Sequence, residues 1–285
     1  MAAPAPAPVP APIPTAPAST GRVLPWGRGL LLVVEGHWTW YKRNWRATAV
    51  SSVLQPLLFL LAFGVGFGSL VQGGGQAAQA TGGVPYLVWL APALLAVSAV
   101  QSAAFESTYP VLSGFKWQRV YHAMGAGPLT PAQVGLGQLA WVALKMAGSG
   151  AIFVVVIALF GGATGPGILL SLLAAVLAGA AVAAVITAFA ATVENEGASF
   201  NMIFRFVVIP MTLFSGTFFP VDRLPGFVQP LTWISPLWHG TVLARDAALG
   251  VWRPLAALGH VAFLVALLAV GAVLVARNFS RRLAR

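Results

Sequence analysis

Residues 167–192 read GILLSLLAAVLAGAAVAAVITAFAAT and contain no charged side chain. About 20 consecutive apolar residues suffice for an α-helix to cross the ~30 Å hydrocarbon core of a bilayer. Five further apolar stretches have a similar character, and they cover residues 47–71, 84–106, 136–160, 203–219 and 254–276. The fifth of the six, 203–219, is short and contains Pro210, which favours a broken helix. The sequence therefore predicts an all-α, polytopic membrane protein with six transmembrane helices.

The composition supports a membrane protein and excludes several other classes. Of 285 residues, 58% are hydrophobic and only 8% are charged, whereas soluble domains carry about 25% charged residues. The absence of cysteine excludes disulfides and thiolate metal sites. The net charge of +10 comes from residues that flank the apolar stretches, so we expect contact with lipid head groups and no nucleic-acid partner.

The chain begins with a segment unlike the rest. Residues 1–25 start with alternating Ala and Pro, which predicts a disordered cytoplasmic tail preceding a transmembrane domain at 26–285. Residues 26–46 mix aromatic and charged side chains, a combination typical of the head-group level of a membrane. We therefore expect an N-terminal interfacial helix, and its candidate residues are Glu35, Trp38, Trp40, Lys42, Arg43 and Trp45.

Lys and Arg counts predict the orientation, because these residues are enriched in cytoplasmic loops. If the six stretches alternate across the membrane, twelve Lys and Arg fall on the side of the two termini and three on the other. Both termini are therefore expected in the cytoplasm of a bacterium whose plasma (inner) membrane holds the protein.

The loop at 107–131 is the most informative segment on the predicted cytoplasmic side. Its stretch FKWQRVYHAM predicts one short amphipathic helix, which Gly125, Gly127 and Pro128 would end. A helix of this kind either rests on the bilayer surface or docks on a soluble partner, and the residues alone leave both open.

Segment 212–240 is predicted on the opposite side of the membrane. It holds four prolines, many aromatic residues and few charges, which favours two short re-entrant helices. The segment is either an interfacial aromatic belt or a lid over an exit path.

Lys145 is a formal charge well inside a predicted span, where a charge costs about 3 kcal/mol on insertion scales. Its side chain can extend to the interface or contact a substrate, and the first is the preferred interpretation. Glu106, at the end of the second stretch, can pair with Lys116, Arg119 or Lys145. Gly64 and Gly68 form a GxxxG spacing, a weak indication of close helix packing.

Several motifs are absent from the sequence. It has no GxxxxGK[ST] phosphate loop, no HExxH metal motif and no GxSxG serine elbow. No catalytic residue, metal site or bound cofactor is therefore predicted. A proton-coupled carrier usually needs acidic residues deep in the bilayer, and the predicted spans have none.

The whole pattern resembles the permease subunits of type-2 ABC exporters. The residues that carry the resemblance are Phe214, Ser215, Gly216, Phe218, Phe219 and Pro220, followed by Leu224-Pro225 and Ser235-Pro236-Leu237. The stretch from Glu106 to Met124 is similar to the nodulation-type branch, the lipo-oligosaccharide export permeases. The resemblance covers about residues 26–280.

The resemblance implies a division of labour with other chains. It implies an ABC ATPase partner that carries ATP and Mg, a second permease copy, more readily a homodimer than a heterodimer, and a lipid-linked or amphipathic cargo such as a glycolipid, lipo-oligosaccharide or drug. It implies a gate role for the interfacial helix and a re-entrant external role for the Phe214–Pro225 segment. The ATPase-coupling helix that it implies consists of Phe115, Lys116, Trp117, Gln118, Arg119, Tyr121 and His122.

Two alternatives belong to other functional classes. A self-sufficient secondary transporter or channel would work without an ATPase. A membrane-embedded lipid-modifying transferase would need a polar cluster at the interface, for which Glu106, Lys116 and His122 are the loose candidates.

Overall fold

The computed structural model describes residues 23–62, 81–195, 197–251 and 253–284. Within these ranges the regular structure is entirely helical, which confirms the predicted all-α class. The elements are α1 (Trp26–Phe59), α4 (Tyr86–Glu106), α5 (Tyr109–Lys116), α6 (Val120–Gly125), α7 (Pro131–Leu159), α8 (Gly167–Ala190), α9 (Ala198–Ile203), the π-helix η2 (Phe204–Val208), α10 (Ile209–Phe214), the 3-10 helix η3 (Val221–Arg223), α11 (Gln229–Ile234), α12 (Pro236–Leu249) and α13 (Pro254–Leu283).

Four helices in the described ranges are long and apolar enough to cross a membrane, and they contain α4, α7, α8 and α13. Their bounds agree with the second, third, fourth and sixth predicted stretches, although α13 continues to Leu283. The end of the first predicted span and its Gly64–Gly68 spacing lie outside the described residues, as does most of the Ala/Pro tail. The structure thus supports a multi-pass membrane protein, while six spans remain a prediction.

The fifth predicted stretch is an irregular helix and ends earlier than expected. It consists of α9, η2 and α10, so the helical course covers Ala198–Phe214 and stops before residue 219. The π-turn precedes Pro210, which has no N–H to donate to a preceding turn. The following segment holds η3, α11 and α12 in place of the two short helices that the sequence predicted.

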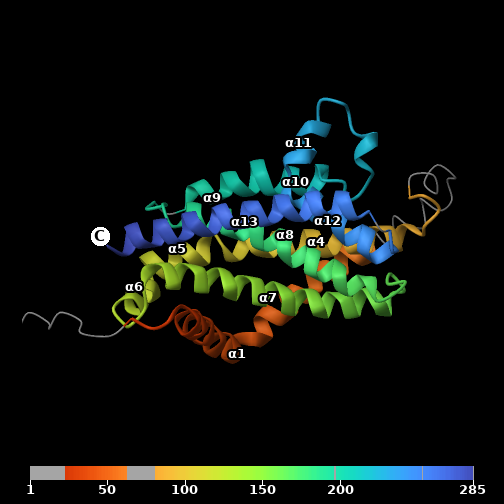
Figure 1. Ribbon diagram of the computed structural model, residues 1–285. Coiled ribbons are helices and arrows are strands. Elements are labelled where there is room, and N and C mark those ends of the chain that lie inside the picture. The colour runs from red at the N-terminus through yellow and green to blue at the C-terminus, as the bar shows by residue number, and fades with distance from the viewer. Residues whose placement is uncertain (1–22, 63–80, 196, 252, 285) are drawn as a thin grey trace, which may run out of the picture.

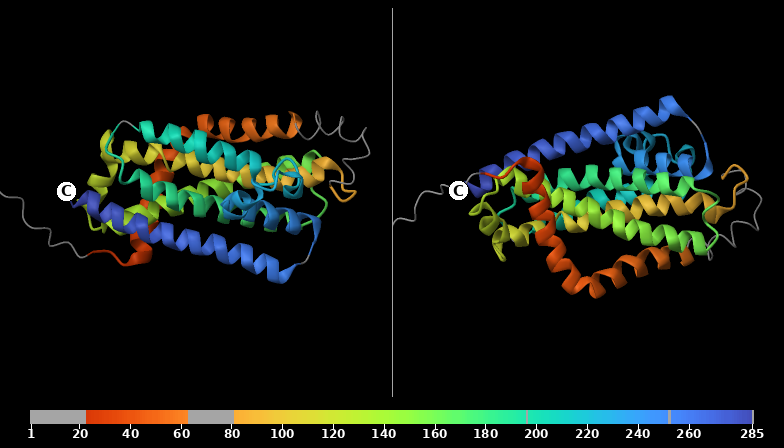
Figure 2. Two further views of the ribbon diagram at one scale, coloured as in Figure 1. Left: turned by 90° about the horizontal axis from the view of Figure 1, so that it is seen from above. Right: turned by 60° about the horizontal axis from the view of Figure 1, so that its bottom comes forward.

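The long helices lie side by side along one direction, with α5, α6 and the C-terminus at one end and the α10–α12 region toward the other (Figure 1). α8 contacts α4, α7, α12 and α13. α1 begins across the first end of the bundle and then changes direction to run along it (Figure 2). The first part of α1 therefore has the transverse course that an interfacial helix requires.

Local sequence signals determine where several helices begin and end. Thr130 and Gln133 form a reciprocal capping box at the start of α7, with Pro131 in the first turn. The Ser235 side chain accepts a hydrogen bond from the Trp238 N–H at the start of α12. Gly250 ends α12 in the left-handed conformation.

Small residues permit the close helix contacts. A Cβ atom added to Gly271 of α13 would lie 2.6 Å from the Ala184 Cβ and 3.0 Å from the Val185 backbone nitrogen on α8. In lipid, helices associate largely through such close packing, because there is little hydrophobic drive between them.

We predict that Gly271→Ala destabilises the protein, because the methyl group must displace α13 from the α8 backbone. Overpacking of this kind costs about 1–3 kcal/mol, which is measurable as a lower unfolding temperature in detergent. Gly259→Ala is the matched control on the same helix, since nothing lies within 4 Å of its added Cβ. Equal unfolding temperatures for the two variants would contradict the prediction.

Candidate functional site

The predicted coupling segment forms two helices instead of one. α5 ends at Lys116 and α6 begins at Val120, so Trp117, Gln118 and Arg119 form the connection. Arg119 has a φ of 53°, a left-handed conformation that interrupts an α-helix and is uncommon for a residue with a side chain. The prediction of a single amphipathic helix over FKWQRVYHAM is therefore wrong, while its end at Gly125 agrees with the structure.

Two aromatic residues of this segment point into the protein. Phe115 and Tyr121 are each 2% exposed, and their ring centroids lie 4.7 Å and 5.2 Å from that of Phe279 near the end of α13. The Arg282 guanidinium lies 4.2 Å from the centre of the Phe115 ring. The α5–α6 pair thus packs on the C-terminal turns of α13. Phe115 and Tyr121 form the buried base of this pair.

The packing of the Tyr121 ring in this base also depends on Gly114. A Cβ atom there would lie 2.4 Å from a ring carbon of Tyr121, so only glycine leaves room for this ring. Burial, with a smaller contribution from the Glu106 carboxylate, raises the pKa of the Tyr121 phenol above its usual value, so the phenol is neutral at physiological pH.

The remaining predicted coupling residues face outward. Lys116, Trp117, Gln118, Arg119 and His122 are all exposed. Trp117 keeps 56% of its surface accessible between two cations. Large aromatic residues beside Arg are typical of protein-docking hot spots, so this exposed group has the composition of a contact surface.

The N-terminal element is fastened to the same end of the bundle. The Leu24 N–H donates to the Pro128 carbonyl (3.0 Å), and the Gln133 side-chain amide donates to the Leu24 carbonyl (2.9 Å). The glutamine that caps α7 thus also holds the start of α1. A displacement of the loop after α6 would act directly on α1 through these two hydrogen bonds.

The first part of α1 packs on α7 through aromatic rings. His37, Trp38 and Tyr41 surround Trp141, with ring-centroid distances of 5.8, 6.4 and 5.6 Å. Burial lowers the pKa of the His37 imidazole to about 4, which keeps it neutral at physiological pH. His37 and Tyr41 were missed among the predicted gate residues, although their i, i+4 spacing places them on one helix face.

The predicted gate residues themselves lie mostly on the outer surface of α1. Trp38 and Trp40 are 49% and 65% exposed, and Glu35, Lys42 and Arg43 are also exposed. The side chain of Trp45 lies outside the described residues. Exposed aromatic and charged side chains on one short segment suit contact with lipid head groups.

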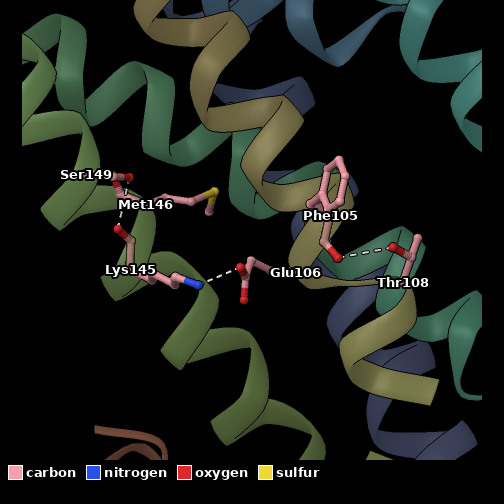
Figure 3. A network of polar contacts seen from close by, with 6 residues as sticks. All are labelled: Phe105, Glu106, Thr108, Lys145, Met146 and Ser149. Atoms are coloured by element: carbon pink, nitrogen blue, oxygen red, sulfur yellow. Dashed lines mark hydrogen bonds and ion pairs between the residues drawn. The ribbon is translucent and has the colours of Figure 1, made fainter. Parts of the chain in front are cut away.

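Lys145 on α7 forms an ion pair with Glu106 at the end of α4, with 2.5 Å between Nζ and Oε1 (Figure 3). The two side chains are 16% and 25% exposed. The Lys145 ammonium also lies 5.7 Å from the centre of the Tyr41 ring on α1. Of the three cations considered for Glu106, the structure brings Lys145 to it, and the contact joins three helices.

The Glu106 region is further fixed by neighbouring hydroxyl groups. Thr108 donates to the Ala104 carbonyl (3.0 Å). It also donates to the Phe105 carbonyl (3.1 Å), while Ser149 donates to the Lys145 carbonyl (3.1 Å) (Figure 3). These bonds satisfy backbone carbonyls where α4 ends and one turn after Lys145 on α7. These bonds stabilise the backbone beside each partner of the Lys145–Glu106 pair.

At the other end of the bundle, α12 and α4 hold the Phe214–Pro220 segment. Arg245 donates to the carbonyls of Trp89 (3.2 Å) and Gly216 (3.0 Å), and its guanidinium lies 3.6 Å from the centre of the Trp89 ring. The Tyr86 hydroxyl donates to the Phe218 carbonyl (3.0 Å). Sequence reasoning counted Arg245 only as a charge on the outer side, although an arginine within an apolar stretch is a signal for such a buried contact.

The predicted re-entrant residues divide into two groups. Ser215 and Gly216 are buried, and the Ser215 hydroxyl hydrogen-bonds the Ser235 hydroxyl (2.6 Å). Phe214, Phe219 and Pro225 are exposed, and Pro220 is partly exposed. Gly216 has a φ of 74°, which accounts for glycine in the turn. The segment therefore has a fixed base and an apolar outer surface.

The helical fold with its apolar helices is that of a membrane protein, and the family match below makes it a membrane subunit of an ABC transporter. Residues 28–249 match the model of the ABC-2 type transporter family, and the chain belongs to that family. ABC-2 permeases work with an ABC ATPase, so the family implies such a partner and the role of a transport subunit.

Among curated proteins, the chain is similar to three proteins named nodulation protein J. It is 30% identical over 238 residues to the one from Sinorhizobium fredii, covering 79% of this chain and 86% of that protein. It is 32% identical over 226 residues to the one from Rhizobium meliloti (75% and 82% covered) and 33% identical over 220 residues to the one from Rhizobium leguminosarum bv. trifolii (74% and 80% covered). These similarities confirm the predicted nodulation-type branch.

We predict that breaking the Lys145–Glu106 pair on one side costs more than removing both charges. Lys145→Met leaves the Glu106 carboxylate without its ammonium partner, and Glu106→Gln leaves the ammonium without its carboxylate. A partly buried charge that loses its partner costs about 1–3 kcal/mol. The measurement is a double-mutant cycle of thermal unfolding in detergent micelles. Strictly additive losses would show that the pair contributes no coupling energy.

We predict that Arg245→Lys loosens the Phe214–Pro220 segment. A lysine ammonium cannot reproduce a planar guanidinium that stacks on Trp89 and donates in two directions. The loss of charge-assisted hydrogen bonds, about 1.5–3 kcal/mol each, should lower the unfolding temperature and speed proteolysis after residue 214. Arg223→Lys on the exposed 3-10 helix is the control. Unchanged proteolysis of the Arg245 variant would exclude the anchoring role.

Proposed function

We propose that the chain is the transmembrane permease of an ATP-driven exporter, and that it moves a lipid-linked or amphipathic substrate outward across a bacterial inner membrane. The candidate substrates are a glycolipid, a lipo-oligosaccharide or a drug. In this proposal the chain has six spans, and both termini lie in the cytoplasm with α5 and α6. ATP and Mg bind to the partner ATPase, and the permease pairs with a second copy of itself.

One observation carries the proposal. Lys116, Trp117, Gln118 and Arg119 form an exposed surface at the end of the bundle, and Phe115 and Tyr121 attach that surface rigidly to α13. A rigidly packed base transmits the movement of a docked protein to the long helices better than a mobile loop does. The hydrogen bonds from Leu24 to Pro128 and from Gln133 to Leu24 then link the same end to α1.

The route of coupling follows from these contacts. When ATP closes two ATPase subunits, the docked α5–α6 pair moves with them and shifts α1 and α13 together. The Lys145–Glu106 pair with Tyr41 joins α1, α4 and α7, so these helices move as one group. The spans thereby follow a two-state change that is driven by a ligand bound to another chain.

The two alternatives find less support among the described residues. A transferase would need Glu106 as a polar interfacial group, yet its carboxylate is engaged by Lys145. A self-sufficient transporter would give no reason for a rigidly mounted, exposed Trp117 between two cations. No observation specifically favours either class.

The proposal predicts that the combined changes Lys116→Ala, Trp117→Ala and Arg119→Ala uncouple the permease from its ATPase. The outward side chains are removed while the buried base is kept, so the protein should fold. We expect at least a tenfold weaker association, corresponding to a loss of about 1.4 kcal/mol or more. Co-purification from membranes and ATP hydrolysis with and without the permease measure it.

Arg281→Ala is the matched control, an exposed cation at the same end of the bundle but on the last turn of α13. It should retain both ATPase association and stimulation. Wild-type behaviour of the triple variant would refute the coupling surface, and failure of the unaltered chain to bind any ABC ATPase would refute the exporter.

A further inference from the structure

An apolar cavity of about 410 Å³ opens between α8, α12 and α13. Leu170, Leu173 and Leu177 form its α8 wall, while Leu243 of α12 and Val261 of α13 face them. Volumes of about 300–1,000 Å³ are typical of small-molecule sites. The cavity involves none of the residues assigned above to coupling, gating or the re-entrant segment.

The lining residues come from the first half of α8, the last turns of α12 and the first turns of α13. These helix ends lie opposite α5 and α6 in the bundle (Figure 1). Toward this end, α13 diverges from the other long helices (Figure 2). Residues of α13 line the cavity along this diverging part of the helix.

The walls of the cavity are held at a fixed separation. His239 on α12 and His260 on α13 face each other with 2.7 Å between their Nδ1 atoms, and Phe263 stacks on His239 at 4.0 Å between ring centroids. The Ser171 hydroxyl of α8 donates to the Ala244 carbonyl of α12 (2.6 Å). The cavity is thus formed before any ligand arrives, which reduces the entropy lost on binding.

Two opposite charges stand among the apolar walls. Asp246 of α12 and Arg253 at the start of α13 both line the cavity. Within the described ranges no direct ion pair joins Asp246 to Arg253. Burial raises the pKa of the Asp246 carboxyl, and the guanidiniums of Arg253 and Arg245 oppose that shift. An anion and a cation held apart at an apolar cavity complement a ligand with an apolar chain and a zwitterionic head.

We propose that this cavity binds one zwitterionic phospholipid with a primary ammonium group, a phosphatidylethanolamine. One acyl chain lies between the leucines of α8 and Val261, the phosphate faces Arg253, and the ammonium donates to the Asp246 carboxylate. An anionic lipid would place its extra negative charge or its uncharged head against Asp246. A trimethylated head group has no N–H to donate to that carboxylate.

Native mass spectrometry of the purified full-length chain tests the site with equal concentrations of dioleoyl phosphatidylethanolamine, phosphatidylcholine and phosphatidylglycerol. We expect one retained phosphatidylethanolamine, preferred about fivefold over each competitor, as one exposed charge-assisted contact allows. Asp246→Asn should abolish the preference for the primary ammonium. Arg253→Gln should weaken retention of all three lipids.

A matched pair on α8 tests the location. Leu170 and Leu169 are 56% and 59% exposed, but only Leu170 lines the cavity. Leu170→Trp should abolish retention, and Leu169→Trp should leave it unchanged. If Leu170→Trp fails to fold, Val261→Trp blocks the same cavity from α13.

Three outcomes would overturn the proposal. Equal retention of the three lipids would indicate ordinary boundary lipid, and equal effects of the two leucine variants would place the lipid elsewhere. Displacement of phosphatidylethanolamine by a glycolipid from the membrane would show that the cavity recognises another head group. None of these results depends on ATPase binding, so they test the lipid site independently of the proposed exporter function.

Discussion

Close approach of α8 to its neighbours is the constraint on which the bundle depends. α8 contacts α4, α7, α12 and α13, and three glycines make these contacts possible. A Cβ on Gly179 would lie 3.1 Å from the Ala99 carbonyl oxygen of α4, and a Cβ on Gly240 of α12 would lie 2.5 Å from that of Ala178. Helices in lipid gain little from burying apolar surface against one another, so van der Waals contact at short range must provide the attraction. The small residues Ala178, Gly179 and Ala184 of α8 are therefore a packing requirement.

The position of α8 determines where the α5–α6 pair lies at one end of the bundle and where the Phe214–Pro220 segment lies toward the other. α13 lies along α8, and its last turns carry Phe279 and Arg282, on which α5 and α6 rest. α12 lies between α8 and α4, which brings Arg245 to the Trp89 carbonyl and ring. The proposed coupling surface and the buried part of the Phe214–Pro220 segment thus depend on one central helix, although they lie toward opposite ends of the bundle (Figure 1).

The sequence predicted the helices well where hydrophobicity alone decides them. The stretches at 84–106, 136–160 and 167–192 match α4, α7 and α8 to within a few residues. Prediction failed where tertiary contact overrides periodicity. Phe115 and Tyr121 were predicted to belong to one amphipathic helix, but the left-handed Arg119 divides that helix, and both rings are buried. The partner of Glu106 was also left open by the sequence, because the structure pairs it with Lys145, 39 residues away, and not with Lys116 or Arg119, which are nearer along the chain.

The cations are of two kinds. Some donate hydrogen bonds to backbone carbonyls, and others make no such bond among the described residues. Arg245 donates to the carbonyls of the Gly216 turn, and Arg282 donates to the carbonyls of Ala190 and Ala191 at the end of α8. Carbonyls at turns and helix ends lack helical donors, and in lipid no water replaces them. These arginines are therefore explained by folding.

Lys116 and Arg119 are of the second kind. In the described part of the chain neither donates to a carbonyl or a carboxylate, and both flank an exposed tryptophan. A chain with only 8% charged residues keeps these two where folding does not use them. Their exposure is consistent with the proposed contact with the ABC ATPase that the family implies.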